Sequence, residues 1–334
     1  MRGRVSARLR LALSFAAIAM TAADAHALDI QGHRGARGLA PENTLPAFAK
    51  ALEIGVTTLE MDCWITKDGV VVVSHDPALN PDITREPDGK WLEKPGPAIW
   101  SLTFKELQRY DVGRIQPGSK YAARWPAQQP VDGTHIPRLA DIFALVRKGG
   151  NEAVRFNIET KISPLEPNET TTPEDFARKL ILAVRSAGMA ERTAIQSFDW
   201  RTLAVVQKEA PEIATVYLTT VSGFMDNIQA GRQPSPWTAG LHVSQFSGSI
   251  PRMVKTAGGG AVWSPYRGDL TREAVKEAQA LGLKVVVWTV NEAAEMRRLI
   301  EWGVDGIISD RPDLLRKVAG DMGVALPRAT PVAP

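Results

Sequence analysis

Short apolar runs alternate regularly with amphipathic helical segments along most of this chain. The segment "LADIFALVRKGG" has the apolar spacing of a helix, and the segment "AVRFNIETK" that follows it has the composition of a strand. The same pairing repeats as far as "VDGIISD" near the carboxyl end. Strands that alternate with helices form parallel sheets, because each helix returns the chain to the same end of the next strand. The alternation therefore predicts an α/β domain, and 334 residues suffice for one of barrel size.

Nine segments have strand character, which is one more than eight strand–helix units require. They are residues 28–32, 57–66, 71–76, 153–161, 192–198, 213–220, 259–267, 283–291 and 304–310. The turn "KDG" at 67–69 accounts for the extra strand, because it joins the second and third segments as a hairpin without a helix. We therefore predict a (β/α)8 TIM barrel with one irregular early repeat. The alternative, an open doubly wound sheet, is disfavoured because no glycine fingerprint of the dinucleotide-binding type is present.

Two segments depart from the alternation. Residues 77–137 are rich in proline, glycine and charge and contain one short helical segment, so we predict an insertion after the early hairpin. The aromatic side chains of this insertion are candidates for the rim of a pocket. Residues 319–334 are rich in proline and alanine and are predicted to be disordered. The folded domain is thus expected to span residues 28–318.

The first 27 residues have the features of a secretory signal peptide. They contain four arginines, then an apolar stretch at 11–20 that is too short to cross a membrane, then Ala25-His26-Ala27 as a small-residue cleavage site. We predict cleavage after Ala27, export to a bacterial periplasm or full secretion, and no stable membrane anchor. The alternative is that the leader stays uncleaved as an anchor.

Outside the leader the charge is balanced. Four of the 40 basic residues and one of the 37 acidic residues lie in the first 27 positions, so the remainder carries 36 of each. The overall net charge of +3 therefore gives no reason to expect nucleic-acid binding. Cys63 is the only cysteine, which excludes an internal disulfide, and we expect it to be a small buried apolar residue.

Polar residues gather at the ends of the predicted strands, where (β/α)8 barrels carry their catalytic side chains. His33 and Arg34 end the first strand and His75 ends the third. Glu60 and Asp62 are two residues apart on the second strand, so their side chains share one face of it.

The predicted strand at residues 153–161 adds a third carboxylate to this set. Glu159 and Lys161 are again two residues apart on one strand. If the strand faces that carry these two pairs both point into the mouth of the barrel, the carboxylates of Glu60, Asp62 and Glu159 converge there. Crowded carboxylates need a counter-charge, and a hard divalent cation with oxygen ligands supplies it. The spacing of cysteine and histidine does not suggest structural zinc.

Two histidines beside a metal suit general acid–base chemistry, in which one removes a proton from the attacking oxygen and the other protonates the leaving oxygen. Arg34 and Lys161 can neutralise an anionic substrate, and arginine fits phosphate oxygens well. Phe198 and Trp288 are candidates for lining the substrate pocket, with core packing as the equal alternative. Gln196 is a candidate for hydrogen bonding either to substrate or to a residue that contacts it.

Several of these motifs together resemble one known family. They are "HRGARGLAPENTLPAF", "LEMDCWITKDGVVVVSHD", "NIETK", "QSF", "WTVN" and "GVDGIISD". This set is similar to the glycerophosphodiester phosphodiesterases, which lie near the phosphatidylinositol-specific phospholipases C, and the resemblance covers nearly all of residues 28–315. It implies a barrel of the predicted kind and hydrolysis of glycerophosphodiesters to glycerol 3-phosphate and an alcohol.

The resemblance also implies residue roles. His33 and His75 correspond to the catalytic acid–base pair, Glu60, Asp62 and Glu159 to the metal ligands, and Arg34 and Lys161 to the phosphate contacts. Because family members use Ca²⁺ or Mg²⁺, an exported protein is expected to use Ca²⁺, with Mg²⁺ as the alternative. The long insertion and the Cys63-Trp64 pair depart from the usual pattern, and both bear on which alcohol group is preferred.

Two other functions stay open at this point. One is a relative of phospholipases D or C that acts on lysolipids, which a long apolar groove would favour. The other is a non-catalytic phosphodiester-binding protein, which could keep Arg34, Lys161 and the carboxylates but would not need both histidines. The sequence leaves the oligomeric state, the metal used in the cell and the nucleophile undecided.

Overall fold

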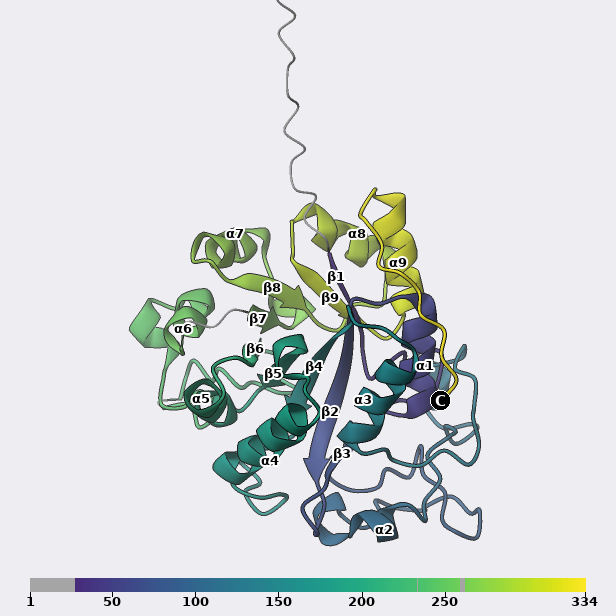
Figure 1. Cartoon of the computed structure of the whole chain (residues 1–334). Helices are drawn as coiled ribbons and strands as arrows, with labels where there is room; N and C mark the ends of the chain where they lie inside the picture. The colour runs from purple at the N-terminus through teal and green to yellow at the C-terminus, as the bar shows by residue number, and fades with distance from the viewer. Residues whose placement is uncertain (1–27, 233, 259–261) are drawn as a thin grey trace, which may run out of the picture.

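Eight parallel strands close into a barrel in the computed structural model, which describes residues 28–232, 234–258 and 262–334 (Figure 1). The strands are β1 (Asp29–Gly32), β2 (Thr58–Ile65), β4 (Arg155–Thr160), β5 (Thr193–Ser197), β6 (Ala214–Thr219), β7 (Val262–Pro265), β8 (Lys284–Val287) and β9 (Gly306–Ser309). Strand β1 pairs in parallel with both β2 and β9, and these two pairings close the ring. The predicted TIM barrel is therefore confirmed.

The surplus strand is β3 (Val71–Val73), which pairs antiparallel with β2 as the hairpin prediction requires. The chain then passes through the long insertion and helix α3 before it re-enters the barrel at β4. The second repeat is therefore the irregular one, because it contains a hairpin and an insertion between its strand and its helix.

Helices surround the barrel (Figure 1). They are α1 (Leu45–Ile54), α3 (Leu139–Lys148), α4 (Pro173–Ser186), α5 (Trp200–Glu209), α6 (Ile250–Thr256), α7 (Arg272–Ala280), α8 (Ala293–Glu301) and α9 (Pro312–Asp321), with the short α2 (Phe104–Leu107) in the insertion. The residues at both ends of helix α1 explain where it begins and ends. Thr44 caps it, Pro46 lies in its first turn, and Gly55 ends it with a left-handed φ of 87°.

Helices α6 and α9 lie where the sequence patterns predicted none. Helix α6 has only seven residues, so its apolar periodicity is too short to recognise, although Ser249 caps it and Pro251 lies in its first turn. Helix α9 follows the last strand and packs Leu315 and Val318 against the barrel and its neighbouring helices.

The segment after α9 lies against the domain, which differs from the predicted disorder. The backbone N–H of Thr330 donates to the carbonyl of Leu52 in α1, and its hydroxyl accepts from Asn151. Val332 packs against the apolar core. Composition describes the segment alone, whereas these contacts depend on the surface that α1 and α3 offer to it.

The insertion has a small apolar core of its own. Leu79, Leu92, Ile99, Leu107, Val112 and Ile136 pack with Trp64 of β2 and Val72 of β3. The insertion is thereby attached to the face of the hairpin that carries Trp64 and Val72, and this face continues the one on which Glu60 and Asp62 lie. Its helix α2 starts with a capping box between Thr103 and Glu106.

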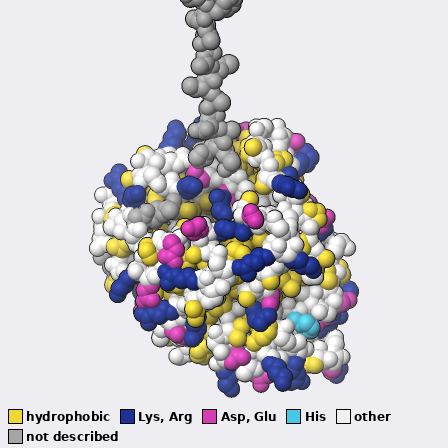
Figure 2. Space-filling view, in the orientation of Figure 1, with side chains coloured by type: hydrophobic (Ala, Val, Ile, Leu, Met, Phe, Trp, Pro, Cys, Tyr) yellow, Lys and Arg dark blue, Asp and Glu magenta, His cyan; other side chains and the backbone are white. Residues whose placement is uncertain are grey.

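Strand β2 separates two environments. Leu59, Met61 and Cys63 belong to the apolar core, whereas Glu60 and Asp62 face the interior cavity of the barrel. Over the part of the chain that the structure describes, no helix has the length and apolar character needed to cross a membrane. On the face in Figure 2, basic and acidic side chains are interspersed.

Candidate active site

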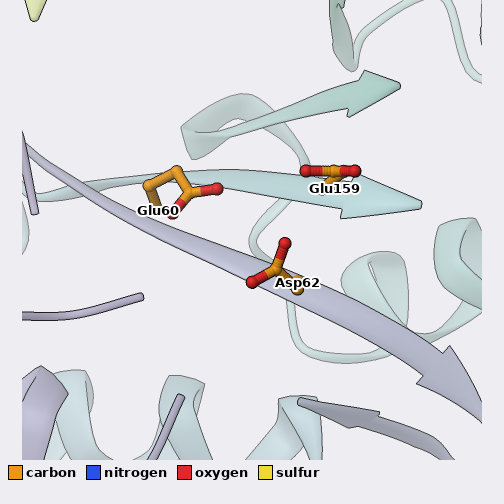
Figure 3. A group of neighbouring side chains, drawn as sticks. All are labelled: Glu60, Asp62 and Glu159. Atoms are coloured by element: carbon orange, nitrogen blue, oxygen red, sulfur yellow. The ribbon is translucent and has the colours of Figure 1, made fainter. Parts of the chain in front are cut away.

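The structure brings the three predicted carboxylates together. Glu60 and Asp62 on β2 and Glu159 on β4 point toward one another (Figure 3), and each offers an oxygen within 4.8 Å of the others. The strand register explains this, because Asp62 pairs directly with Glu159. Their exposed fractions are 2%, 1% and 7% for Glu60, Asp62 and Glu159, so the cluster is nearly shielded from water.

The electrostatics of this cluster favour a bound cation. Burial and the charge of Asp62 raise the pKa of Glu60 well above its usual range. Burial and Asp62 also raise the pKa of Glu159 to about 7, against the opposing effect of Lys161. Three ionised carboxylates so close together repel one another, and a divalent cation with oxygen ligands removes that repulsion. The donor set therefore fits an ion such as Ca²⁺ or Mg²⁺.

A tight turn after β1 places His33 and Arg34 at the mouth of the barrel. A Cβ at Gly32 would lie 2.1 Å from the carbonyl oxygen of Gly35, so a side chain there is excluded. Gly35 has φ of +83°, and a Cβ on it would lie 2.6 Å from the backbone carbon of Ala47. Gly32 and Gly35 thus allow this turn to lie directly on α1.

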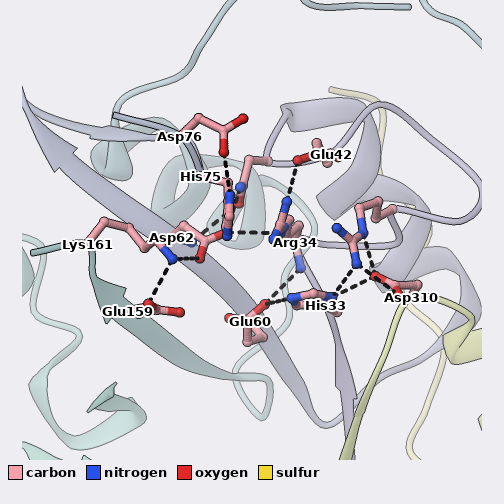
Figure 4. A network of polar contacts seen from close by, with 12 residues as sticks. His33, Arg34, Glu42, Glu60, Asp62, His75, Asp76, Glu159, Lys161 and Asp310 are labelled. Carbon is pink, nitrogen blue, oxygen red and sulfur yellow. Dashed lines mark hydrogen bonds and ion pairs between the residues drawn. The ribbon is translucent and has the colours of Figure 1, made fainter. Parts of the chain in front are cut away.

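His33 is held by a carboxylate on its Nδ1 side. Nδ1 lies 2.6 Å from Asp310 Oδ1, and Nε2 lies 3.9 Å from Glu60 Oε2 (Figure 4). Burial raises the pKa of Asp310, but its ion pairs and hydrogen bonds with His33 and Arg37 outweigh burial and hold that pKa well below its usual range. An ionised Asp310 keeps a proton on Nδ1, which leaves Nε2 as an acceptor. Because burial lowers the pKa of His33, its ring is neutral at neutral pH.

His75 is also held by a carboxylate on its Nδ1 side. Its Nδ1 lies 2.8 Å from Asp76 Oδ1, and Asp76 accepts a second hydrogen bond from Asn80. Burial and the charges of Arg34 and Lys161 lower the pKa of His75 to about 4. Trp64 donates its indole N–H to the backbone carbonyl of His75 at 3.0 Å.

The positively charged side chains of Arg34 and Lys161, which the sequence predicted as phosphate contacts, both lie among the carboxylates. Arg34 Nη1 donates to Glu42 Oε1 at 2.6 Å, and its Nε lies 3.2 Å from Asp62 Oδ2. Lys161 Nζ lies 2.9 Å from Glu159 Oε1 and 3.7 Å from Asp62 Oδ1 (Figure 4). Two positive charges therefore flank the carboxylate cluster, where they can approach an anion bound to it.

These side chains line one cavity of about 380 Å³. One wall is polar and contains both histidines, both cations and the three carboxylates. The other wall is largely apolar, and it consists of Phe198, Leu218, Phe224, Met225, Trp288 and Ile308. Phe198 and Trp288 meet edge to face with ring centroids 5.3 Å apart, so both predicted aromatic residues reach the pocket.

Gln196 also lines this cavity and contacts a carboxylate. Its Nε2 donates to Glu60 Oε1 at 2.7 Å, and the residue is 1% exposed. Of the two alternatives left open by the sequence, this geometry corresponds to contact with a cluster residue.

Several site residues were not identified from the sequence. Asp310 directly follows β9, so the rule that placed the histidines at strand ends could have found it. Arg37 donates to both oxygens of Asp310, at 2.7 and 3.0 Å, but nothing in its local pattern marks it. Tyr121 comes from the insertion and donates to Glu42, and Arg37 stacks over the ring of Trp125. Only the folded insertion brings these two aromatic residues to the site.

A TIM barrel with this combination of histidines, carboxylates and cations at the carboxyl ends of its strands is an enzyme of the phosphodiester hydrolase type. Comparison with known proteins agrees. Residues 33–314 match the glycerophosphoryl diester phosphodiesterase family. A glycerophosphodiester phosphodiesterase from Caldanaerobacter subterraneus subsp. tengcongensis is 30% identical over 284 residues, which are 85% of this chain and 94% of that protein.

Solved structures give the same result. A protein from Silicibacter pomeroyi DSS-3, assigned as a glycerophosphoryl diester phosphodiesterase, is 35% identical with a TM-score of 0.79, and the match covers 90% of this chain and 95% of that one. An Oleispira antarctica phosphodiesterase in complex with its product sn-glycerol-3-phosphate shares the fold at 21% identity, with a TM-score of 0.62 and coverage of 87% and 96%. The chain belongs to the glycerophosphoryl diester phosphodiesterase family.

Proposed function

We propose that this enzyme hydrolyses glycerophosphodiesters to glycerol 3-phosphate and an alcohol, in a metal-dependent reaction in which His33 and His75 act as the acid–base pair. The observation that carries the proposal is that both histidines line the same cavity as the carboxylate cluster and the two cations. A phosphodiester in this cavity meets positive charge, a base and an acid together.

His33 is the proposed base. Asp310 orients its ring through Nδ1, so Nε2 faces the cluster with a free lone pair, and the lowered pKa of His33 keeps it unprotonated. It takes a proton from the attacking oxygen. That oxygen belongs to the glycerol 2-hydroxyl, which gives a cyclic phosphate first, or to water.

His75 is the proposed acid, and it must therefore gain a proton when substrate binds. In the free enzyme its pKa of about 4 results from burial and from the charges of Arg34 and Lys161. A bound phosphodiester brings negative charge to these two cations, which opposes their effect and raises the pKa of His75. Asp76 accepts from Nδ1 and stabilises the protonated ring, which then protonates the leaving alkoxide.

Glu60, Asp62 and Glu159 are the proposed ligands of the metal, with Ca²⁺ expected and Mg²⁺ as the alternative. The bound ion would supply charge neutralisation and polarisation at a phosphoryl oxygen. Arg34 and Lys161 bind the remaining phosphoryl oxygens, as their positions beside Asp62 allow. Such an ion would also remove the repulsion among the three carboxylates.

A second candidate is a phosphodiesterase of the lysophospholipase D or C type. The apolar wall, in which Leu218, Phe224 and Met225 join Phe198 and Trp288, could contact an acyl chain. A non-catalytic phosphodiester-binding protein is less favoured, because binding alone has no use for two histidines that are each oriented by an aspartate.

We also propose that the protein is exported, to a bacterial periplasm or beyond. The signal peptide that supports this proposal lies in residues 1–27, outside the described residues. N-terminal sequencing of the exported protein should begin at Leu28. A mature chain that retains its arginine-rich leader would contradict the proposal.

One assay tests the proposed reaction. Release of glycerol 3-phosphate is measured from a panel of glycerophosphodiesters and lysolipids, each with Ca²⁺, with Mg²⁺ and after exhaustive chelation. We expect turnover of small glycerophosphodiesters that chelation abolishes and metal restores. Preference for lysolipids would favour the second candidate, and full activity after chelation would remove the metal from the proposal.

A further inference from the structure

A path of hydrogen bonds runs inside the barrel from the amino ends of the strands to Glu60. Gln31 on β1, Asn157 on β4 and Gln196 on β5 form it, and we refer to these three residues as the amide column. Asn157 Nδ2 donates to Gln31 Oε1 at 3.0 Å and to Gln196 Oε1 at 2.9 Å. The glutamines then donate outward, Gln31 to Asp29 Oδ2 at 2.9 Å and Gln196 to Glu60 Oε1 at 2.7 Å.

The amide column occupies positions that barrels usually fill with apolar residues. Layers of valine, isoleucine and leucine are the common filling of such an interior. Gln31, Asn157 and Gln196 are 4%, 1% and 1% exposed, so their amides have lost contact with water. Buried amides cost stability unless they are hydrogen-bonded. The column satisfies most of that need internally, and one end of it reaches a proposed metal ligand.

Asn157 determines which way each glutamine amide points. Its Nδ2 uses both of its hydrogens, one on each glutamine oxygen. Each glutamine carbonyl therefore faces Asn157, and each NH2 group faces a carboxylate at the far end. A reversed Gln196 would place its carbonyl oxygen against Glu60 Oε1, and two acceptors would then face one another.

Glu60 is consequently held from two sides. Its Oε1 accepts from Gln196, and its Oε2 accepts from the backbone N–H of Arg34 at 2.9 Å. Each oxygen keeps a second lone pair for another partner. Hydrogen bonds of this kind orient a ligating carboxylate and are known to affect metal affinity strongly.

We propose that Asn157 and Gln196 are positioning residues for the metal site: Asn157 sets the orientation of the Gln196 amide, and Gln196 in turn fixes the Glu60 carboxylate in its ligating position. The inference rests on the proposed function, since it requires Glu60 to bind a metal. Gln31 belongs to the same column, but its amide donates to Asp29, away from the site. This difference between the two glutamines makes the proposal testable.

The test is a calorimetric titration of the full protein with Ca²⁺ and with Mg²⁺. Asn157→Ala and Gln196→Met should each weaken metal binding by about 10- to 100-fold. The double variant should lose little more than the weaker-binding single variant, because both residues act through one contact. Gln31→Met is the matched control, because Gln31 is also buried and also accepts from Asn157, and this variant should bind metal as the wild type does.

Thermal unfolding of the metal-free variants measures how much each substitution destabilises the fold. This separates a loss of Glu60 positioning from a general loss of packing. If Gln31→Met loses as much metal affinity as Asn157→Ala, the column acts only through packing and the inference is wrong. Wild-type affinity in both Asn157→Ala and Gln196→Met would also overturn it. Should Asn157→Ala fail to fold, Gln196→Met still decides. Failure of the wild type to bind either metal would instead overturn the metal part of the proposed function.

Discussion

The two halves of the barrel interior differ in the side chains they contribute. Strands β1, β2, β4 and β5 place polar residues inside: Gln31, Thr58, Glu60, Asp62, Asn157, Glu159 and Gln196. Strands β6 to β9, with the residue that follows β8, contribute mostly apolar ones: Val216, Leu218, Val262, Val286, Trp288 and Ile308. The apolar half resembles an ordinary barrel interior, in which burial stabilises the closed sheet.

The polar half has to be satisfied by hydrogen bonds and charge pairs instead. Its carboxylates repel one another, and its amides are stable inside only because they are bonded in a column. The difference indicates that the apolar half stabilises the barrel and shapes the pocket, while the polar half provides the chemistry at a cost in stability. Substitutions on the two sides should therefore affect different measurements.

The largest expected effect is on catalysis from the polar wall. His33→Ala and His75→Ala should each lower kcat by about 10²- to 10⁴-fold, the usual contribution of general acid–base groups, while metal binding persists. A substrate with a nitrophenol leaving group needs little protonation, so it should restore turnover in His75→Ala and not in His33→Ala. Rescue of His33→Ala instead would reverse the two roles. Wild-type turnover in both variants would remove the histidines from the mechanism.

The next effect concerns metal affinity and pH. A carboxylate must be ionised to bind the metal, and the pKa of Glu159 is raised to about 7 by burial and by Asp62. Metal affinity should therefore fall as pH falls below about 7, by up to tenfold per pH unit for one competing proton. Calorimetry in buffers of different ionisation enthalpy should detect a proton released on binding near pH 6. An affinity that stays constant from pH 5.5 to 8 would contradict the raised pKa.

A smaller effect should come from the apolar half. Val286→Ala removes two methyl groups from a nearly buried side chain, so the free energy of unfolding should fall by about 1.5 kcal/mol. Because Val286 lies toward the amino ends of the strands, away from the site, kcat and metal affinity should stay at wild-type values. Denaturant unfolding and steady-state kinetics check both parts. A fall in kcat that the loss of stability does not explain would contradict the proposed division between the two halves.

The smallest effect is expected where the insertion meets the polar wall. Tyr121→Phe removes one hydrogen bond to Glu42, but the bond from Arg34 to Glu42 remains. Glu42 acts on the site through Arg34, whose bond to it remains, so kcat/KM should fall by only about two- to tenfold. Tyr110→Phe, in the same insertion, is the control and should leave kcat/KM unchanged. Equal losses in the two variants would mean that the insertion acts through its general stability.

Much of this site was predictable because it depends on local patterns. A spacing of two residues puts Glu60 and Asp62 on one face of β2, whatever lies around that strand. The barrel rule then directs attention to strand ends, where His33 and His75 lie. Helix α1 was equally accessible, since Thr44 and Gly55 mark its ends by their own conformations.

The order of strands and helices, the extra hairpin and the residue types at each strand end could all be predicted from the amino-acid sequence, because they follow from periodicity and turn chemistry over a few residues. The contacts between side chains from distant parts of the chain, in contrast, exist only once the barrel has folded. Closure of β9 onto β1 brings Asp310 to His33 across 277 positions, and the strand register brings Asn157 to Gln31 across 126. Such hydrogen bonds depend on barrel closure and register, which no short segment encodes.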